Sequence, residues 1–273
     1  MFVSEAVWEY VDDREGRGEI GARTAYELRT RLLKMARQMG DPPLEHFGPT
    51  AVAKWQRSVA HQRASTRQTL CSTLSGFCRW LLQEGLIEQD PTLRLGRVRL
   101  PVSVPKTLNA AQMARLQRVL PDARARAIIA LQSRLGLRCI EVANLMVADW
   151  DRDTGTLVVR GKFDNQRRLP VPDDVARVLD AYLGGRTDGP LVGGTAPYLS
   201  RQVSLWMDKA GIKTAPRDGL SAHALRRTAA SDLYDQTKDV RLAQRLLGHR
   251  SIATTDRYLR PGDLDELRAA LRR

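Results

Sequence analysis

The sequence predicts a mainly α-helical protein with a small β-hairpin or sheet, an α+β fold in two domains. Apolar residues recur at helical spacing through the first hundred residues. An aperiodic stretch with two prolines then interrupts that pattern. The second half adds one pair of strand-like segments to further amphipathic helices. We therefore expect a helical domain at residues 1–97, a linker at 98–107 and a mixed domain at 108–273.

Helical periodicity predicts three amphipathic helices in the first domain. Their apolar residues recur at three- and four-residue steps, so each set occupies one helix face. The sets are Leu28, Leu32, Met35 and Met39; Val52, Trp55 and Val59; and Leu70, Leu74, Phe77 and Leu81. We expect Ser65 to cap the third helix at its N-terminus and Gly85 to end it.

The second domain is expected to mix helices and strands. Asn109 is a suitable N-cap after the linker, and residues 122–136 predict a helix with a buried apolar centre. Residues 157–160 and 168–171 predict two strands joined by a turn. Four more amphipathic helices are expected within residues 173–185, 198–211, 221–236 and 239–249.

Charge and cysteine content favour a nucleic-acid partner in a reducing compartment. The 273 residues carry a formal net charge of +13, which promotes association with polyanions. Residues 1–19 are acidic, but residues 20–100 hold 13 basic and 6 acidic residues, and residues 101–273 hold 29 and 19. Three cysteines without metal-ligand spacing indicate reduced thiols. We see neither a signal peptide nor an apolar run of membrane-spanning length, so we expect a cytoplasmic protein without a membrane partner.

Residues 219–233 place a histidine and an arginine at a helix start. Ser221 is a suitable N-cap, and His223 and Arg226, three residues apart, share a face. Free backbone amides beside these two side chains suit a phosphate, although a solvated basic face explains the same pattern.

A second arginine begins another expected helix. Gly136 ends the preceding helix, and Arg138 lies three residues before Glu141. We expect Ile140 and Ala143 to point inward. Either the Arg138–Glu141 pair is purely structural, or the Glu141 carboxylate holds the Arg138 guanidinium in position for chemistry.

Three more residues carry reactive groups. Lys162 lies where a strand enters a turn, in a chain with only seven lysines against 37 arginines, although a charge at a hairpin tip needs no function. His249 follows Gly248 at a helix end, and Tyr258 lies nine residues further on. The remaining histidines have no supporting motif.

These residue types suit the attack of a phenol on a phosphodiester. The tyrosine proton, with an ordinary pKa of about 10, must leave during attack. Guanidiniums stabilise charge on the phosphorus-bound oxygens, and a lysine can protonate the departing oxygen. We therefore expect neither a cofactor nor a metal ion.

The segments "GLRCIEVANL", "RGKFDNQRRLPVP", "HALRRTAAS" and "LLGHRSIATTDRY" resemble the tyrosine recombinase (phage integrase) family in order and spacing. The resemblance implies a helical core-binding, SAM-like DNA-binding domain followed by a catalytic domain. It further implies that the catalytic residues are Arg138, Lys162, His223, Arg226, His249 and Tyr258, with Glu141 as a supporting acid.

The resemblance implies a site-specific recombinase (an integrase) that cleaves and rejoins DNA through a 3′-phosphotyrosyl intermediate, as a tetramer on core sites. We expect the simple form without an arm-binding domain, acting on the nucleoid of a bacterial or phage-infected cell, with room for a directionality factor. One departure is Arg227, where many members have histidine. We assign the motif's arginine to Arg226, which keeps the step of three.

Two questions stay open at this point. Leu264, Leu267 and Leu271 predict a short tail helix that docks either on a neighbouring subunit or on its own domain. A catalytically inactive DNA-binding regulator and a type IB topoisomerase-like enzyme are alternatives to a recombinase.

Overall fold

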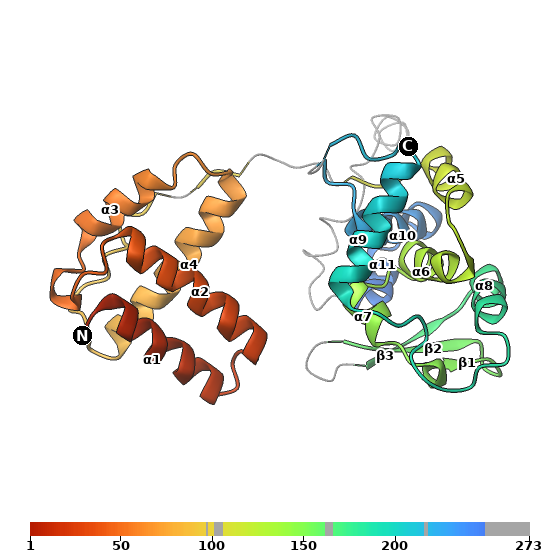
Figure 1. Ribbon diagram of the computed structural model, residues 1–273, viewed down its shortest axis with the longest axis horizontal. Helices are drawn as coiled ribbons and strands as arrows, with labels where there is room; N and C mark the ends of the chain where they lie inside the picture. The colour runs from red at the N-terminus through yellow and green to blue at the C-terminus, as the bar shows by residue number, and fades with distance from the viewer. Residues whose placement is uncertain (97, 101–105, 162–165, 216–217, 249–273) are drawn as a thin grey trace, which may run out of the picture. The chain divides into compact units, whose positions relative to one another are not determined.

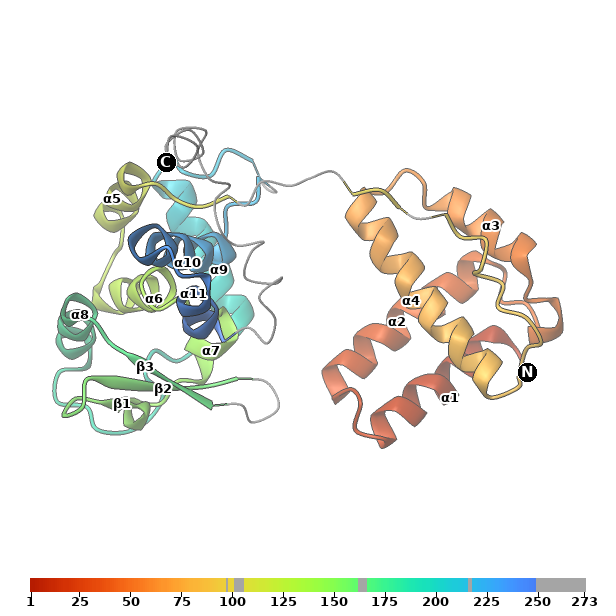
Figure 2. The ribbon, with the colours of Figure 1, turned by 180° about the vertical axis from the view of Figure 1, so that it is seen from behind.

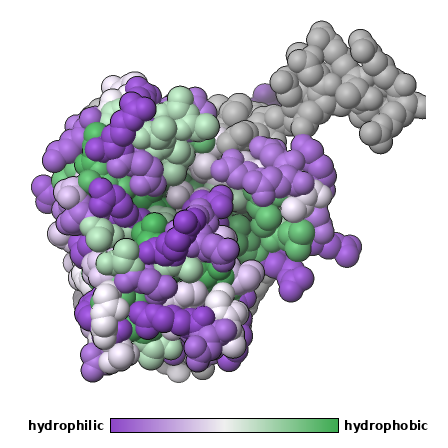
Figure 3. Space-filling view, turned by 90° about the vertical axis from the view of Figure 1, so that its right-hand side faces the viewer, coloured by the Kyte–Doolittle hydropathy of each residue, from purple (hydrophilic) through white to green (hydrophobic). Residues whose placement is uncertain are grey.

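The chain divides into two compact units, Met1–Val102 and Ser103–Arg273, in a computed structural model. The structure describes residues 1–96, 98–100, 106–161, 166–215 and 218–248. Figure 3 shows one face, on which hydrophilic side chains predominate and hydrophobic areas lie between them. Among the described residues, no helix has the length and apolar character needed to cross a membrane.

The described residues of the first unit form helices, with one isolated bridge between Phe2 and Pro43 (Figure 1). Its elements are α1 (Val3–Gly16), α2 (Ala22–Gln38), the 3-10 helix η1 (Leu44–His46), α3 (Pro49–Ser58) and α4 (Ala64–Gln83). Helices α1, α2 and α4 pack on one another. Their core includes an aromatic group, in which the Tyr10 ring centroid lies 5.4 Å from that of Phe77 and 5.3 Å from that of Trp80. A complete core of its own is what a separately folding domain requires.

The predicted helices of the first unit are confirmed with one error at a cap. Leu32, Trp55 and Phe77, one from each predicted stripe, are all fully buried. Gly85 follows the end of α4 with a φ of +68°, a left-handed conformation that glycine adopts without a steric penalty. The N-cap prediction was wrong, because α4 begins at Ala64 and places Ser65 inside its first turn.

In the second unit a small sheet lies along one edge of a group of helices (Figure 2). Its helices are α5 (Ala110–Arg118), α6 (Ala123–Ser133), α7 (Cys139–Asn144), the 3-10 helix η2 (Val147–Asp149), α8 (Asp173–Leu183), α9 (Ala196–Lys209), α10 (Ala222–Thr237) and α11 (Val240–Leu247). The strands β1 (Trp150–Asp151), β2 (Thr156–Arg160) and β3 (Gln166–Pro170) form an antiparallel sheet in the order β1-β2-β3. This confirms the mainly α-helical fold with a small sheet.

Packing in the second unit brings the candidate segments together. Helix α6 lies against both α8 and α10, while α10 also packs on α11, and α7 packs on α9. The backbone amide of Leu108 donates to the Thr228 hydroxyl (2.8 Å), which fixes the start of the unit on α10. Asn109 caps α5 as expected, since its side chain accepts from the Gln112 amide.

Two details of the second unit differ from expectation. The two expected strands, 157–160 and 168–171, are β2 and β3, which cover Thr156–Arg160 and Gln166–Pro170. The two-residue strand β1 is too short to leave a pattern in the sequence. The prediction that Ile140 points inward was wrong: its side chain is exposed, while Ala143 is half-buried against the core. In this six-residue helix, Glu141 and Val142 are the buried side chains.

Candidate active site

The structure describes four of the seven predicted site residues. Arg138 is the N-cap of α7, Glu141 lies within α7, and His223 and Arg226 lie in the first two turns of α10. Ser221 occupies the N-cap position of α10, with no capping hydrogen bond from its side chain to the described residues. The other three predicted residues lie outside the described residues; they are Lys162, His249 and Tyr258.

Glu141 is the centre of a cluster of three arginines. Its Oε1 accepts from Nη1 of Arg138 and from Nη1 of Arg167, both at 2.9 Å. Its Oε2 accepts from the Arg138 backbone amide at 2.8 Å and from Nη2 of Arg167 at 3.1 Å. Nη1 of Arg226 lies 3.5 Å from the same Oε2. Three guanidiniums around one carboxylate leave this cluster, named here the Glu141 cluster, with a net positive charge.

Exposure differs sharply among the members of the Glu141 cluster. The side chain of Arg226 is 1% exposed, that of Arg167 16%, and that of Arg138 37%, around a carboxylate that is 3% exposed. Arg226 also donates to the backbone carbonyls of Gly136 and Leu247, the latter at 2.5 Å. It therefore joins the turn before Arg138 to the end of α11, while Arg138 offers its guanidinium toward solvent.

The Glu141 carboxylate stays ionised despite its burial. Burial raises its pKa, but the hydrogen bonds and charge of Arg167, the Arg138 amide and the charge of Arg226 outweigh this and lower the pKa below its ordinary value. A charged Glu141 can therefore hold the surrounding guanidiniums at neutral pH.

His223 is held in its neutral form by its surroundings. Partial desolvation lowers its pKa most, and the positive charges of Arg227, Arg226 and Arg138 lower it further. A neutral imidazole can accept a proton, which an imidazolium cannot.

Arg167 is the member of the Glu141 cluster that the sequence analysis missed. It lies on β3, where Leu169, two residues on, is buried while Arg168 between them is exposed. Since residues two apart on a strand share a face, the apolar Leu169 was a signal that Arg167 points toward the interior.

The end of α11 lies directly against this cluster. A Cβ built on Gly136 would come within 2.9 Å of the Leu247 side chain, and a Cβ on Gly248 within 3.1 Å of both Cδ and Nη1 of Arg167. Both glycines have positive φ, at +65° and +62°. The last described residue before His249 is therefore in contact with the arginine cluster.

The arrangement can stabilise the negative charge on the oxygens of a phosphate, including one whose phosphorus becomes trigonal-bipyramidal during attack. Planar guanidiniums neutralise phosphoryl oxygens bidentately, and a fixed carboxylate keeps them oriented without reorganisation during reaction. Within the described part of the chain, no group of three or more His, Cys, Asp or Glu side chains is placed to hold a metal ion.

The first unit carries grooves along α4 that polar and apolar side chains line together. One groove of about 530 Å³ is lined by Arg14 of α1 and by α4 residues that include Thr69 and Arg79. A second of about 260 Å³ is lined by Arg31 and again by Thr69. We name the polar α4 residues that line them, apart from Leu70 and Gly76 in the same linings, the α4 polar face: Ser65, Thr66, Gln68, Thr69, Ser72, Thr73 and Arg79.

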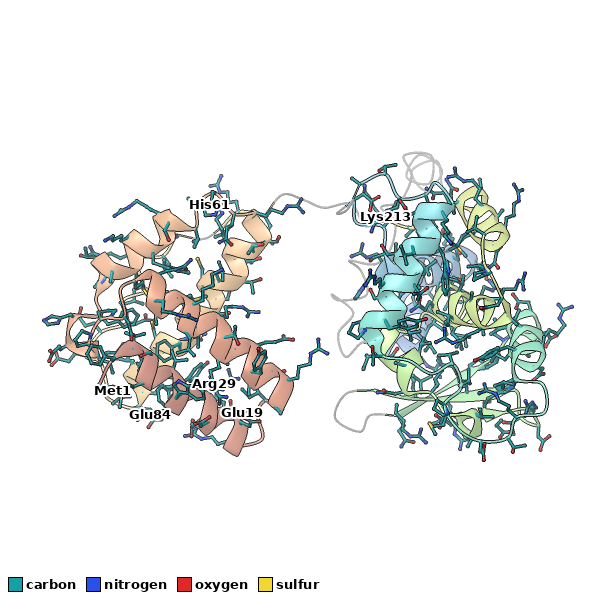
Figure 4. The ribbon with its side chains drawn as sticks, in the orientation of Figure 1. Met1, Glu19, Arg29, His61, Glu84 and Lys213 are labelled. Carbon is teal, nitrogen blue, oxygen red and sulfur yellow. The ribbon has the colours of Figure 1, made fainter. Side chains whose placement is uncertain are left out.

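Arg29 belongs to the same basic unit but is held by local contacts. It lies between α1 and α2 in Figure 4, with its guanidinium 4.3 Å from the Trp8 ring centroid and 2.5 Å from the Asp12 carboxylate. Its charge is therefore partly offset within the unit, unlike a side chain that stands free in solvent.

Known proteins match this chain in sequence. The family model "Phage integrase family" matches residues 106–263. The chain is 32% identical over 257 residues to "Tyrosine recombinase XerC" of Pseudomonas aeruginosa, covering 88% of this chain and 84% of that protein.

Solved structures share the fold at low identity. A lambda integrase(75-356) dimer bound to a COC′ core site matches with a TM-score of 0.81 at 20% identity, over 94% of this chain and 95% of the other. A lambda integrase tetramer bound to a Holliday junction also matches with a TM-score of 0.81 at 20% identity, over 96% and 80%. At that identity the likeness is one of fold.

Proposed function

The chain belongs to the phage integrase family of tyrosine recombinases, enzymes that cleave and rejoin DNA strands, and we propose that it is a site-specific recombinase of double-stranded DNA. The observation that carries the proposal is the Glu141 cluster. One buried carboxylate orients three guanidiniums, and the net positive charge that remains suits a scissile phosphate.

The proposed reaction begins with attack by the Tyr258 hydroxyl. Its oxygen bonds to phosphorus as the phenolic proton leaves, and the bond from phosphorus to the 5′ oxygen breaks. Lys162 protonates the departing oxygen, and the neutral His223 is a suitable acceptor for the phenolic proton. The product is a 3′-phosphotyrosyl bond and a free 5′-hydroxyl, and attack by a partner strand's hydroxyl reverses the step.

Arg138 and Arg226 have distinct parts in this proposal. The half-exposed Arg138 binds the phosphate oxygens directly, since its guanidinium reaches solvent. The buried Arg226 fixes the turn before Arg138 and the end of α11, and its charge adds to the field at the phosphate. His249 lies two residues beyond the end of α11, outside the described residues, and we assign it a hydrogen bond to the same phosphate.

DNA binding in this proposal uses both units. The α4 polar face combines hydroxyls, a glutamine and an arginine, which suit contacts to the phosphate backbone. Assembly as a tetramer on core sites is supported by the lambda integrase tetramer bound to a Holliday junction, which shares this fold. We place the enzyme on DNA in the cytoplasm of a bacterial or phage-infected cell.

A XerC-like role is a second candidate beside integration. It is favoured by 32% identity to the Pseudomonas aeruginosa tyrosine recombinase XerC over most of both chains. Recombination between two sites on one circular DNA, compared with recombination between two separate DNAs, would separate a resolving role from an integrating one.

A nicked suicide substrate tests the proposal. When the short strand diffuses away after cleavage, the wild-type chain should remain covalently bound to DNA, and Tyr258→Phe should bind DNA without forming the adduct. Tyr234→Phe is the matched control, because this tyrosine lies in the same unit on α10 and should leave the adduct intact.

An adduct in Tyr258→Phe would overturn the assignment of the nucleophile. DNA binding by the wild type with no adduct on any substrate would favour a regulator without catalysis. Relaxation of supercoiled DNA by a monomer, without exchange between paired sites, would favour the topoisomerase-like alternative.

A further inference from the structure

Arg167 makes the most complete contact with the Glu141 carboxylate. Its two terminal nitrogens donate to the two carboxylate oxygens, at 2.9 and 3.1 Å, as a parallel bidentate pair. The Arg138 side chain reaches one of those oxygens, and Arg226 lies further away at 3.5 Å. A bidentate pair fixes the plane of the carboxylate, which a single hydrogen bond does not.

The strand position of Arg167 determines which way it faces. It pairs with Val159 of β2 and shares a face with the buried Leu169. Its neighbour Arg168 pairs with Val158 and is exposed on the other face. Strand β3 therefore aims one of two adjacent arginines at α7 and the other at solvent.

The same side chain also lies close to the end of α11. A Cβ on Gly248 would lie 3.1 Å from both Cδ and Nη1 of Arg167, a distance at which one of the two groups must move. Gly248 has a φ of +62°, so glycine also meets a conformational need there. One side chain thus connects β3, the carboxylate of α7 and the residue that precedes His249.

Loss of Arg167 would change how the Glu141 carboxylate pairs with Arg138. Without the bidentate guanidinium of Arg167, both oxygens of the Glu141 carboxylate become available to Arg138, the most exposed arginine of the cluster. A tighter Arg138–Glu141 pair would turn that guanidinium away from solvent and neutralise it.

From these contacts we propose that Arg167 is a positioning residue for strand cleavage: it holds Glu141 and the end of α11 in place and makes no contact with DNA. The proposal rests on the proposed recombinase function. It assigns Arg167 a part in the reaction through other residues, since its own side chain is only 16% exposed.

The test compares Arg167→Met with Arg168→Met, which removes the same charge from the adjacent exposed position of the strand. We expect Arg167→Met to lower single-turnover cleavage of the suicide substrate by about 10²-fold, the order that a misplacement of 1 Å can cost, with DNA affinity close to that of Arg168→Met. The cleavage rate of Arg167→Lys should lie between those of Arg167→Met and Arg168→Met, because lysine restores the charge but not the bidentate contact.

A pH profile separates positioning from a general loss of structure. Removing Arg167 takes away the main influence that lowers the Glu141 pKa, so the acid limb of cleavage should move to higher pH. Gly248→Ala should cause the same shift without changing any charge, by displacing the Arg167 side chain. In the double variant with Glu141→Gln, the part of the Arg167 effect that passes through the Glu141 carboxylate should disappear.

If Arg167→Met fails to fold, Arg167→Lys and Gly248→Ala carry the same test. Wild-type cleavage rate and pH profile in the folded variants would overturn the positioning role. Absence of an adduct in the wild-type chain would instead overturn the proposed function, so the two failures are distinguishable.

Discussion

Replacing Glu141 with glutamine should destabilise the second unit by about 3–5 kcal/mol, the usual cost of removing one partner from a buried ion pair. The carboxylate is 3% exposed, and N–H groups of Arg138, Arg167 and Arg226 converge on it. Glutamine keeps the shape but offers one acceptor oxygen, and its amide nitrogen would face guanidinium donors. For a unit of this size, the loss corresponds to a fall in Tm of roughly 6–20 °C.

The assay is thermal and urea unfolding of the full chain, with Asp149→Asn as a matched control. Asp149 is also a buried carboxylate, but its partner Arg160 lies 2.6 Å away with a side chain that is 49% exposed. Because Arg160 can rehydrate when unpaired, the control should be less destabilised. Equal losses in the two variants, or a Glu141→Gln chain as stable as wild type, would refute the reasoning.

The stability lost in Glu141→Gln should depend on pH in one direction. Glu141 has a folded-state pKa below its ordinary value of 4.5, so its stabilisation is fully present above pH 4.5 and is lost as the pH falls through the lower, folded-state pKa. The stability gap between wild type and Glu141→Gln should therefore be widest near neutral pH and narrow below pH 4.5. A gap that widens on acidification would contradict the ionised state of Glu141.

Three further outcomes are expected. Arg138→Lys should keep wild-type stability and lose most of its cleavage rate, whereas Arg226→Lys should lose both, because only Arg226 is fully buried; cleavage and unfolding measured on the same samples check this. His223 should titrate below its ordinary pKa of 6.5 when followed by NMR, because burial and the neighbouring arginines both lower its pKa; a pKa at or above 6.5 would contradict both effects. Gly136→Ala should lower the free energy of unfolding more than Gly155→Ala. Both glycines have positive φ, but only at Gly136 would an added Cβ meet other side chains. Equal unfolding free energies in the two variants would exclude a packing cost at Gly136.

Much of the fold could be predicted because local signals and burial agree. Asn109 caps α5, Gly85 ends α4, and the stripe residue Phe77 lies in the first core, as the sequence indicated. Helix α1 was not identified as a separate element, although its buried residues follow helical spacing; they are Val3, Ala6, Val7, Tyr10 and Val11. Acidic residues that are interleaved with these apolar positions weaken the pattern.

The candidate site was predictable in part, and the missing part depends on tertiary contacts. Arg226 and Glu141 are 85 positions apart in the sequence, so no local pattern reports their approach. Ile140 was placed inward on helical periodicity, but a six-residue helix gives that pattern little support, and the paired charge of Glu141 takes the buried position. Arg167 differs from Arg168 only by strand register, which the buried Leu169 would have indicated.

The central claim is that a phenolic oxygen becomes esterified to DNA beside the arginine cluster. The most direct measurement is mass spectrometry of the adduct trapped on the suicide substrate, after digestion with nuclease and trypsin. We predict a nucleotide on Tyr258, within the tryptic peptide that spans residues 258–268. A nucleotide on any other residue, or no covalently bound nucleotide when cleavage is observed, would contradict it.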